Sequence, residues 1–152
     1  MTFLKEGVKA PPFSGKNQNG DIISLDNYKG KKIVLYFYPK DNTSGCTAEA
    51  CSLNNSYLDF IEKGFDVVGI SPDKESSHLK FIAKYELRFN LIADIDHKIA
   101  TDYGVWGEKK MYGKSYMGIF RTTFIINEEG FIEKIIDKVD TKNHAEQIFG
   151  IV

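Results

Sequence analysis

The sequence predicts an α/β fold in which a mixed central sheet is flanked by helices. Its 152 residues, 42% of them hydrophobic and 27% charged, have the composition of one globular domain, which we place at residues 1–152. Strand-like and helix-like segments alternate through the middle of the chain, which favours parallel strands joined by helices. A predicted hairpin and helix follow near the end, and the hairpin adds antiparallel strands to the sheet.

The first part of the chain is predicted to form a hairpin, a buried strand and a long helix. Residues 13–25 form the hairpin, because the Asn-Gly pair at positions 19–20 tolerates the positive φ angles of a type I′ turn. Residues 33–38 are continuously apolar, as in a strand that is covered on both faces. The helix is expected over residues 45–63, with Gly64 as its C-terminal cap.

The middle of the chain repeats the alternation of strand and helix. Strands are predicted at residues 65–70 and 90–93, and helices at residues 75–85 and 96–103. In the first of these helices three apolar residues are expected to face the core, namely Leu79, Phe81 and Ile82.

The last third of the chain is expected to begin with a long loop. Residues 104–118 are rich in glycine and aromatic residues, which favours a loop. Residues 121–126 and 131–136 are predicted as the two strands of a hairpin. Residues 141–149 then form a closing helix, for which Thr141 is the expected N-cap.

Charge and hydropathy exclude several classes of function. The formal net charge is −1 and no basic stripe is present, so we expect no nucleic acid partner. No apolar run is long enough to span a membrane, and the first residues have no apolar core that could serve as a secretory signal. We therefore expect a cytoplasmic protein.

The two cysteines of the chain, Cys46 and Cys51, stand directly after the apolar strand at residues 33–38. Pro39 and the polar residues after it end that strand, and the predicted helix then begins so that Cys46 falls in its first turn. Unpaired backbone N–H groups give a helix N-terminus a positive field, which favours a thiolate. Structural disulfides are rare in the cytoplasm, so the pair indicates a redox or metal role.

Other interpretations of the cysteine pair have less support. Two buried core thiols are the simplest alternative. The spacing Cys-x4-Cys differs from the Cys-x-x-Cys of thioredoxin-type reductases, and the chain lacks the second cysteine pair or the His-x3-His of a zinc site. We therefore expect no metal and no other cofactor. The histidines, His78, His97 and His144, are expected to be exposed and to have no catalytic role.

The segment that runs from Pro39 to Cys51 resembles the active-site segment of the peroxiredoxins. The pattern Pro-x-x-x-Thr-x-x-Cys is met by Pro39, Thr43 and Cys46, and a second cysteine five residues on is similar to the bacterioferritin comigratory protein, or peroxiredoxin Q, subfamily. Ser44 stands where this family usually has proline, which we expect to alter loop rigidity rather than chemistry. The likeness continues through residues 67–71, 104–109 and 118–127.

The resemblance implies a thioredoxin-like fold with an N-terminal β-hairpin extension, and a peroxidase that reduces hydrogen peroxide and organic hydroperoxides in antioxidant defence. It implies that Cys46 is the nucleophile, which becomes a sulfenic acid, and that Cys51 condenses with it to form an intramolecular disulfide. Thioredoxin, or a thioredoxin-like protein, would then reduce that disulfide. An internal resolving cysteine removes the need for a dimer, so we expect a monomer or a weak dimer.

Four further residues of this pattern suit the chemistry. The resemblance places Arg121 beside the thiolate, where a guanidinium that is always charged can hold both the sulfur and the peroxide oxygens. Thr43 is expected to accept a hydrogen bond from the peroxide and to donate one to the thiolate. Pro39 would wall the pocket without adding a donor. Glu49 would orient Arg121, although a solvated helix position is an equal alternative.

Helix geometry conflicts with a disulfide between the two cysteines. Five residues along a helix separate Cα atoms by about 8.6 Å, whereas a disulfide needs them within about 7 Å. The turn between Cys46 and Cys51 must therefore unwind before the bond can form.

Two other classes of function remain open. A peroxide sensor or redox relay would use the same cysteine chemistry and pass the oxidation to a partner. A catalytically idle binding module of the same fold is disfavoured, because Pro39, Thr43, Cys46 and Arg121 are all present.

Overall fold

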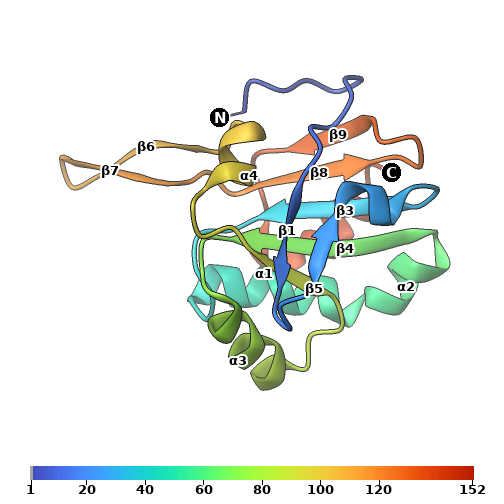
Figure 1. Cartoon of the computed structure of the whole chain (residues 1–152), viewed down its shortest axis with the longest axis horizontal. Coiled ribbons are helices and arrows are strands. Elements are labelled where there is room, and N and C mark those ends of the chain that lie inside the picture. The colour runs from blue at the N-terminus through green and yellow to red at the C-terminus, as the bar shows by residue number, and fades with distance from the viewer. Residues whose placement is uncertain (1) are drawn as a thin grey trace.

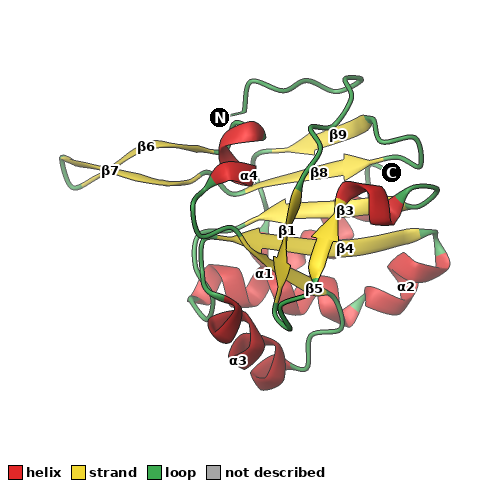
Figure 2. Ribbon diagram, in the orientation of Figure 1, coloured by secondary structure: helices red, strands yellow, loops and turns green. Residues whose placement is uncertain are grey.

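The computed structural model describes residues 2–152 and contains a seven-stranded sheet with helices on both faces (Figures 1 and 2). In chain order the elements are β1 (Ser14–Asn17), β2 (Ile22–Ser24), η1 (Leu25–Tyr28), β3 (Lys32–Phe37), α1 (Ser44–Asn55), α2 (Tyr57–Glu62), β4 (Phe65–Ser71), α3 (Glu75–Tyr85), β5 (Asn90–Ala93), α4 (Lys98–Asp102), β6 (Trp106–Met111), β7 (Lys114–Ile119), β8 (Thr122–Ile126), β9 (Ile132–Ile136), η2 (Thr141–Asn143) and α5 (His144–Phe149).

The sheet is mixed, as predicted. Its strand order is β2-β1-β5-β4-β3-β8-β9. The three central strands β5, β4 and β3 are parallel, and helices connect them. Strand β8 pairs antiparallel with β3, and β9 with β8, while the β1–β2 hairpin joins the other edge through β5. The predicted fold class is therefore confirmed.

Strand β3 separates the two halves of the hydrophobic core. Its side chains alternate between the faces of the sheet, so Ile33 and Leu35 pack with α4, while Val34 and Tyr36 pack with α1, α3 and α5. All four are fully buried, which explains why the sequence of this strand is apolar without interruption. Cys46 belongs to the second half of the core.

The helix that follows β3 is shorter than predicted. It is divided at Ser56 into α1 and α2, and Gly64 comes after α2 with a φ of 85°. Asn54, near this break, uses its side chain to bind the segment that follows α3. Its amide donates to the Glu86 carbonyl at 3.1 Å and accepts from the Arg88 backbone N–H at 3.0 Å.

The loop predicted at residues 104–118 is wrong, because β6 and β7 form an antiparallel hairpin there that projects from the body of the molecule (Figure 1). Its turn has Tyr112 and Gly113 at φ angles of 52° and 76°, the pair of positive values that a type I′ turn requires. Most side chains of this hairpin are exposed, so the apolar alternation that marks a half-buried strand is missing from its sequence.

The turn of the first hairpin also differs from the prediction. Gly20 has a φ of 80°, but Asn19 is not in the left-handed region, so the turn is not type I′. The side chain of Asn17 organises the loop instead, since its Oδ1 accepts from the N–H groups of Asn19 and Asp21 at 2.9 and 3.0 Å.

At the other end of the chain, Thr141 is not the N-cap of the closing helix: Asn143 holds that position, and Asp140 caps the turn before it. The Asp140 carboxylate accepts from the Asn143 N–H, and a short turn, η2, precedes α5. Helix α3 has the predicted bounds, but Leu79 is 49% exposed and His78 occupies the buried position beside it. No helix within residues 2–152 is long and apolar enough to cross a membrane.

Candidate active site

Cys46 lies in the first turn of α1 and is almost completely buried, with 1% of its surface exposed. Thr43 is the N-cap residue of this helix and adopts an extended backbone conformation. Its carbonyl accepts the first helical hydrogen bond, from the Thr47 N–H at 2.8 Å. The sulfur therefore sits where the helix has unpaired N–H groups and its field is positive.

Arg121 brings a permanent positive charge to this sulfur from the opposite part of the chain. It directly precedes β8, the neighbour of β3 in the sheet. Its Nη2 donates to Cys46 Sγ at 3.3 Å, and its Nη1 donates to Glu49 Oε1 at 2.7 Å. Burial alone would lower the pKa of Arg121, but the charges of Glu49 and Cys46 raise it above its ordinary value. One planar guanidinium thus spans two side chains of α1.

Glu49 is fully buried between α1 and α5, which decides against a solvated helix position. Burial raises the pKa of its carboxyl from 4.5 to about 7, although Arg121 opposes this change. Its second oxygen, Oε2, has no hydrogen-bond partner among residues 2–152 and lies 3.6 Å from His144 Nε2. The carboxyl therefore titrates near neutral pH inside the protein.

Thr43, three residues before Cys46, is exposed and makes a different hydrogen bond from the one expected. Its hydroxyl donates to the Lys40 carbonyl at 2.9 Å rather than to the thiolate. A hydroxyl has one proton and two lone pairs, so Thr43 keeps its acceptor capacity free. Pro39 is half-buried and lies two residues after the end of β3, in the loop that carries Thr43.

Cys51 lies on the same helix and is partly exposed, and both cysteines are free thiols. Burial raises the pKa of the Cys51 thiol above its ordinary value of 9.0. The neighbouring residue, Ser52, accepts from the backbone N–H of Ala145 at 3.0 Å and so ties α1 to the start of α5. The continuous helix keeps the two thiols apart, as its geometry predicts.

The prediction that the histidines are exposed is wrong, since His78 and His144 are completely buried and His97 is half-buried. His144 donates from Nδ1 to the side-chain oxygen Oε1 of Gln147 and accepts at Nε2 from the Thr123 hydroxyl, both at 2.8 Å. Burial lowers the pKa of His144, which fits this neutral form. A buried histidine leaves no periodic pattern in the sequence, so nothing in the chain distinguishes it from an exposed one.

A metal site has no support in the described residues. None of the groups of histidine, cysteine, aspartate and glutamate within residues 2–152 is suited to hold a metal ion. Cys46 is a buried sulfur held between a helix N-terminus and a guanidinium, and the Thr43 hydroxyl stands three residues before it in the chain.

Comparison with known proteins identifies the family. The sequence profile of the AhpC/TSA family matches residues 7–135. The chain belongs to this family. It is 47% identical over 144 residues to peroxiredoxin Bcp of Bacillus subtilis, a match that covers 95% of this chain and 92% of the relative.

Solved peroxiredoxin structures have the same fold. Peroxiredoxin Q of Xanthomonas campestris superimposes with a TM-score of 0.86 at 33% identity and covers 98% of this chain and 94% of its own. A structure of the bacterioferritin comigratory protein from the same organism, described in terms of its alkyl peroxide reduction activity, has a TM-score of 0.86 at 32% identity, with 99% and 96% covered. The chain is accordingly a peroxiredoxin, an enzyme that reduces peroxide with a thiol.

Proposed function

We propose that this peroxiredoxin reduces hydrogen peroxide and organic hydroperoxides through Cys46, and that Cys51 resolves the oxidised form. The observation that carries the proposal is the guanidinium of Arg121, which donates to Cys46 Sγ while it is held by the buried Glu49. This arrangement places donors beside the sulfur and where charge develops on the leaving oxygen.

In the first step the Cys46 thiolate attacks the outer oxygen of the peroxide. The S–O bond forms as the O–O bond breaks, so the sulfur is oxidised to a sulfenic acid and the other oxygen leaves as an alkoxide or hydroxide, which takes up a proton. Arg121 stabilises the leaving oxygen, and the free lone pairs of the Thr43 hydroxyl accept from the peroxide O–H. Pro39 keeps water from this side of the sulfur.

In the second step the thiol of Cys51 attacks the sulfenic sulfur, and water leaves as the disulfide forms. The helical turn between the two cysteines has to unwind first, because helix geometry holds them too far apart. Unwinding releases Glu49 from Arg121 and Ser52 from Ala145. It also exposes the Cys51 thiol, whose pKa then returns toward its ordinary value, so that a larger fraction of it is the reactive thiolate.

A dithiol protein of the thioredoxin type then reduces the disulfide by exchange, and the cycle restarts. Because each turnover depends on such a reductant, the enzyme suits a cytoplasm that keeps thiols reduced. The resolving thiol is on the same chain as the nucleophile, so a monomer can complete the cycle.

The test is peroxide consumption by the wild type, Cys46→Ser and Cys51→Ser, with and without a thioredoxin system. Cys46→Ser should lose all activity. Cys51→Ser should consume one equivalent of peroxide and then stop. If Cys46→Ser keeps its activity, the proposal is wrong, and if Cys51→Ser turns over with thioredoxin, the resolving thiol is not Cys51. A wild type that is oxidised but does not turn over would instead indicate a sensor or relay.

A further inference from the structure

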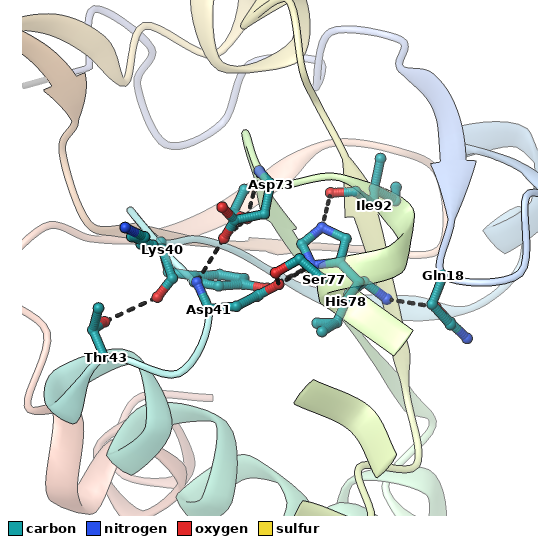
Figure 3. A network of polar contacts seen from close by, with 11 residues as sticks. Gln18, Lys40, Asp41, Thr43, Asp73, Ser77, His78 and Ile92 are labelled. Atoms are coloured by element: carbon teal, nitrogen blue, oxygen red, sulfur yellow. Dashed lines mark hydrogen bonds and ion pairs between the residues drawn. The ribbon is translucent and has the colours of Figure 1, made fainter. Parts of the chain in front are cut away.

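The peptide unit between Lys40 and Asp41, in the loop before α1, is held by hydrogen bonds at both of its ends. Its carbonyl accepts from the Thr43 hydroxyl at 2.9 Å, and its N–H donates to Asp73 Oδ2 at 2.6 Å (Figure 3). A peptide unit is planar, so the direction of its N–H fixes the direction of its carbonyl. The carboxylate of Asp73 therefore sets the direction of the Lys40 carbonyl, which accepts the hydrogen bond from Thr43.

Asp73 itself has a defined position at the end of β4. Its backbone N–H donates to the Ser71 hydroxyl at 3.2 Å, and that hydroxyl is 3.3 Å from Asp73 Oδ2. A hydrogen bond from an N–H to a carboxylate is stronger than one between neutral groups, and it polarises the peptide so that its carbonyl becomes a better acceptor. The Thr43 hydroxyl is thereby kept pointing its proton at the Lys40 carbonyl oxygen.

A second, buried set of bonds prevents the loop from turning around this peptide. The Asp41 carboxylate accepts from the Tyr38 hydroxyl at 2.5 Å, from the Ser77 hydroxyl at 2.8 Å and from His78 Nδ1 at 2.7 Å. The other nitrogen of His78 lies 3.0 Å from the Ile92 carbonyl (Figure 3). His78 thus bridges Asp41 to β5, with Nδ1 on the Asp41 carboxylate and Nε2 on the Ile92 carbonyl. Any rotation of the loop would break these buried hydrogen bonds.

We infer that Asp73 is a positioning residue of the peroxidase, which makes Thr43 an acceptor for the peroxide O–H. Because the Thr43 hydroxyl donates its proton in a hydrogen bond to the Lys40 carbonyl, it presents only lone pairs to the substrate. Asp73 does not touch the substrate and acts through the peptide and Thr43. The inference rests on the role proposed above for Thr43.

The decisive variant is Asp73→Ala, measured with two reagents that attack Cys46. Iodoacetamide needs only the thiolate, whereas a peroxide also needs the acceptor. We expect the rate with hydrogen peroxide to fall about tenfold, the effect of one lost hydrogen bond, while the rate and pH profile of alkylation stay unchanged. Asp73→Asn should recover most of the peroxide rate, because its amide oxygen can accept from the same N–H. Asp96→Ala, a change at an exposed aspartate, is the matched control.

A double-mutant cycle with Thr43→Val tests whether Asp73 affects the peroxide rate through Thr43. If Asp73 acts through Thr43, then Asp73→Ala adds no further loss once the hydroxyl is gone. Equal slowing of both reagents, or losses that multiply in the double variant, would overturn the inference. A Thr43→Val variant with the full peroxide rate would remove the proposed role of Thr43 and this inference with it. The assignment of Cys46 as the nucleophile would stand, because it depends on Cys46→Ser alone.

Discussion

The guanidinium of Arg121 and the carboxylate of Glu49 form an ion pair across the interior, with Nη1 donating to Oε1 at 2.7 Å. The same guanidinium donates to the sulfur of Cys46. Glu49 lies between the two cysteines in α1, on the turn that has to unwind. The pair therefore helps to position the guanidinium beside Cys46 for the attack on peroxide. It also lies on the helical turn that has to open before the disulfide can form.

Replacing Arg121 with lysine should slow the reaction with peroxide although the charge is kept. A lysine ammonium has no planar fork that can reach Cys46 and Glu49 in fixed directions at once. We expect the second-order rate with hydrogen peroxide to fall by a factor on the order of 10², as for the loss of a donor aimed at a developing charge. Stopped-flow oxidation under single-turnover conditions measures it.

The matched control for this substitution is Arg88→Lys. Arg88 also binds α1, through Asn54 near its other end, and so tests the general effect of exchanging arginine for lysine on this helix. Its peroxide rate should stay close to that of the wild type. Equal rates for Arg121→Lys and the wild type would mean that charge alone is needed at this position.

The titration of Glu49 should make the resolving step depend on pH. The pKa of Glu49 is about 7 while α1 is folded, because burial disfavours the charge, and it returns toward 4.5 once the turn unwinds. The folded turn therefore binds the proton more tightly than the unwound turn. As pH rises from about 4.5 to about 7 the folded turn loses stability, by up to about 3 kcal/mol above that window. Glu49 should therefore accelerate disulfide formation across this window and add no further acceleration above it.

The variant Glu49→Gln should lack this dependence, because an amide does not titrate. The rate of disulfide formation can be followed after oxidation with one equivalent of peroxide, from pH 5 to pH 8. Ionisation of the Cys51 thiol also speeds the reaction as pH rises, but it does so equally in the variant and in the wild type, so the difference between the two profiles isolates Glu49. A pH slope that is the same in the variant and in the wild type would rule out Glu49 as its source.

Amide exchange should reveal the unwinding itself. In the reduced protein the backbone N–H groups of residues 46–51 lie within α1 and should be protected, whereas in the disulfide form they should exchange far faster. Helix α3 serves as the internal reference, because it takes no part in the change. Unchanged protection of residues 46–51 after oxidation would mean that the disulfide forms without opening the turn.

The sequence predicted the fold where apolar patterns are strong. Strand β3 is buried on both faces and β5 is paired on both edges, and both were placed within one residue of their bounds. The β6–β7 hairpin was missed because its side chains mostly face solvent. Without a buried face, its sequence lacks the alternation of apolar and polar residues that marks a strand. The break at Ser56 was missed because Asn54 makes contacts with residues far along the chain.

The candidate site divides in the same way. Cys46, Thr43 and Cys51 are close in sequence, so their spacing indicated a site, and the resemblance supplied Arg121 from 75 positions away, beside Cys46 in space. The support of the site was not predictable. His144 and Asp73 reach it through tertiary contacts, and the direction of the Thr43 hydrogen bond depends on the conformation of the loop.

Gly45→Ala should affect the stability of α1 and the peroxide rate of the enzyme in different ways. Alanine in a helix is ordinarily more favourable than glycine by up to about 1 kcal/mol. At this position, however, the added Cβ would lie 3.2 Å from Arg121 Nη2, and Arg121 cannot easily withdraw because Nη1 is bound to Glu49. We expect a melting temperature that is unchanged or higher, together with a peroxide rate that falls several-fold. Gly150→Ala is the control, since its Cβ would make only ordinary contacts, at 3.5 Å or more. A Gly45→Ala enzyme with the full rate would show that the guanidinium can shift by a few tenths of an ångström without loss, and that its alignment with Cys46 is less strict than the geometry implies.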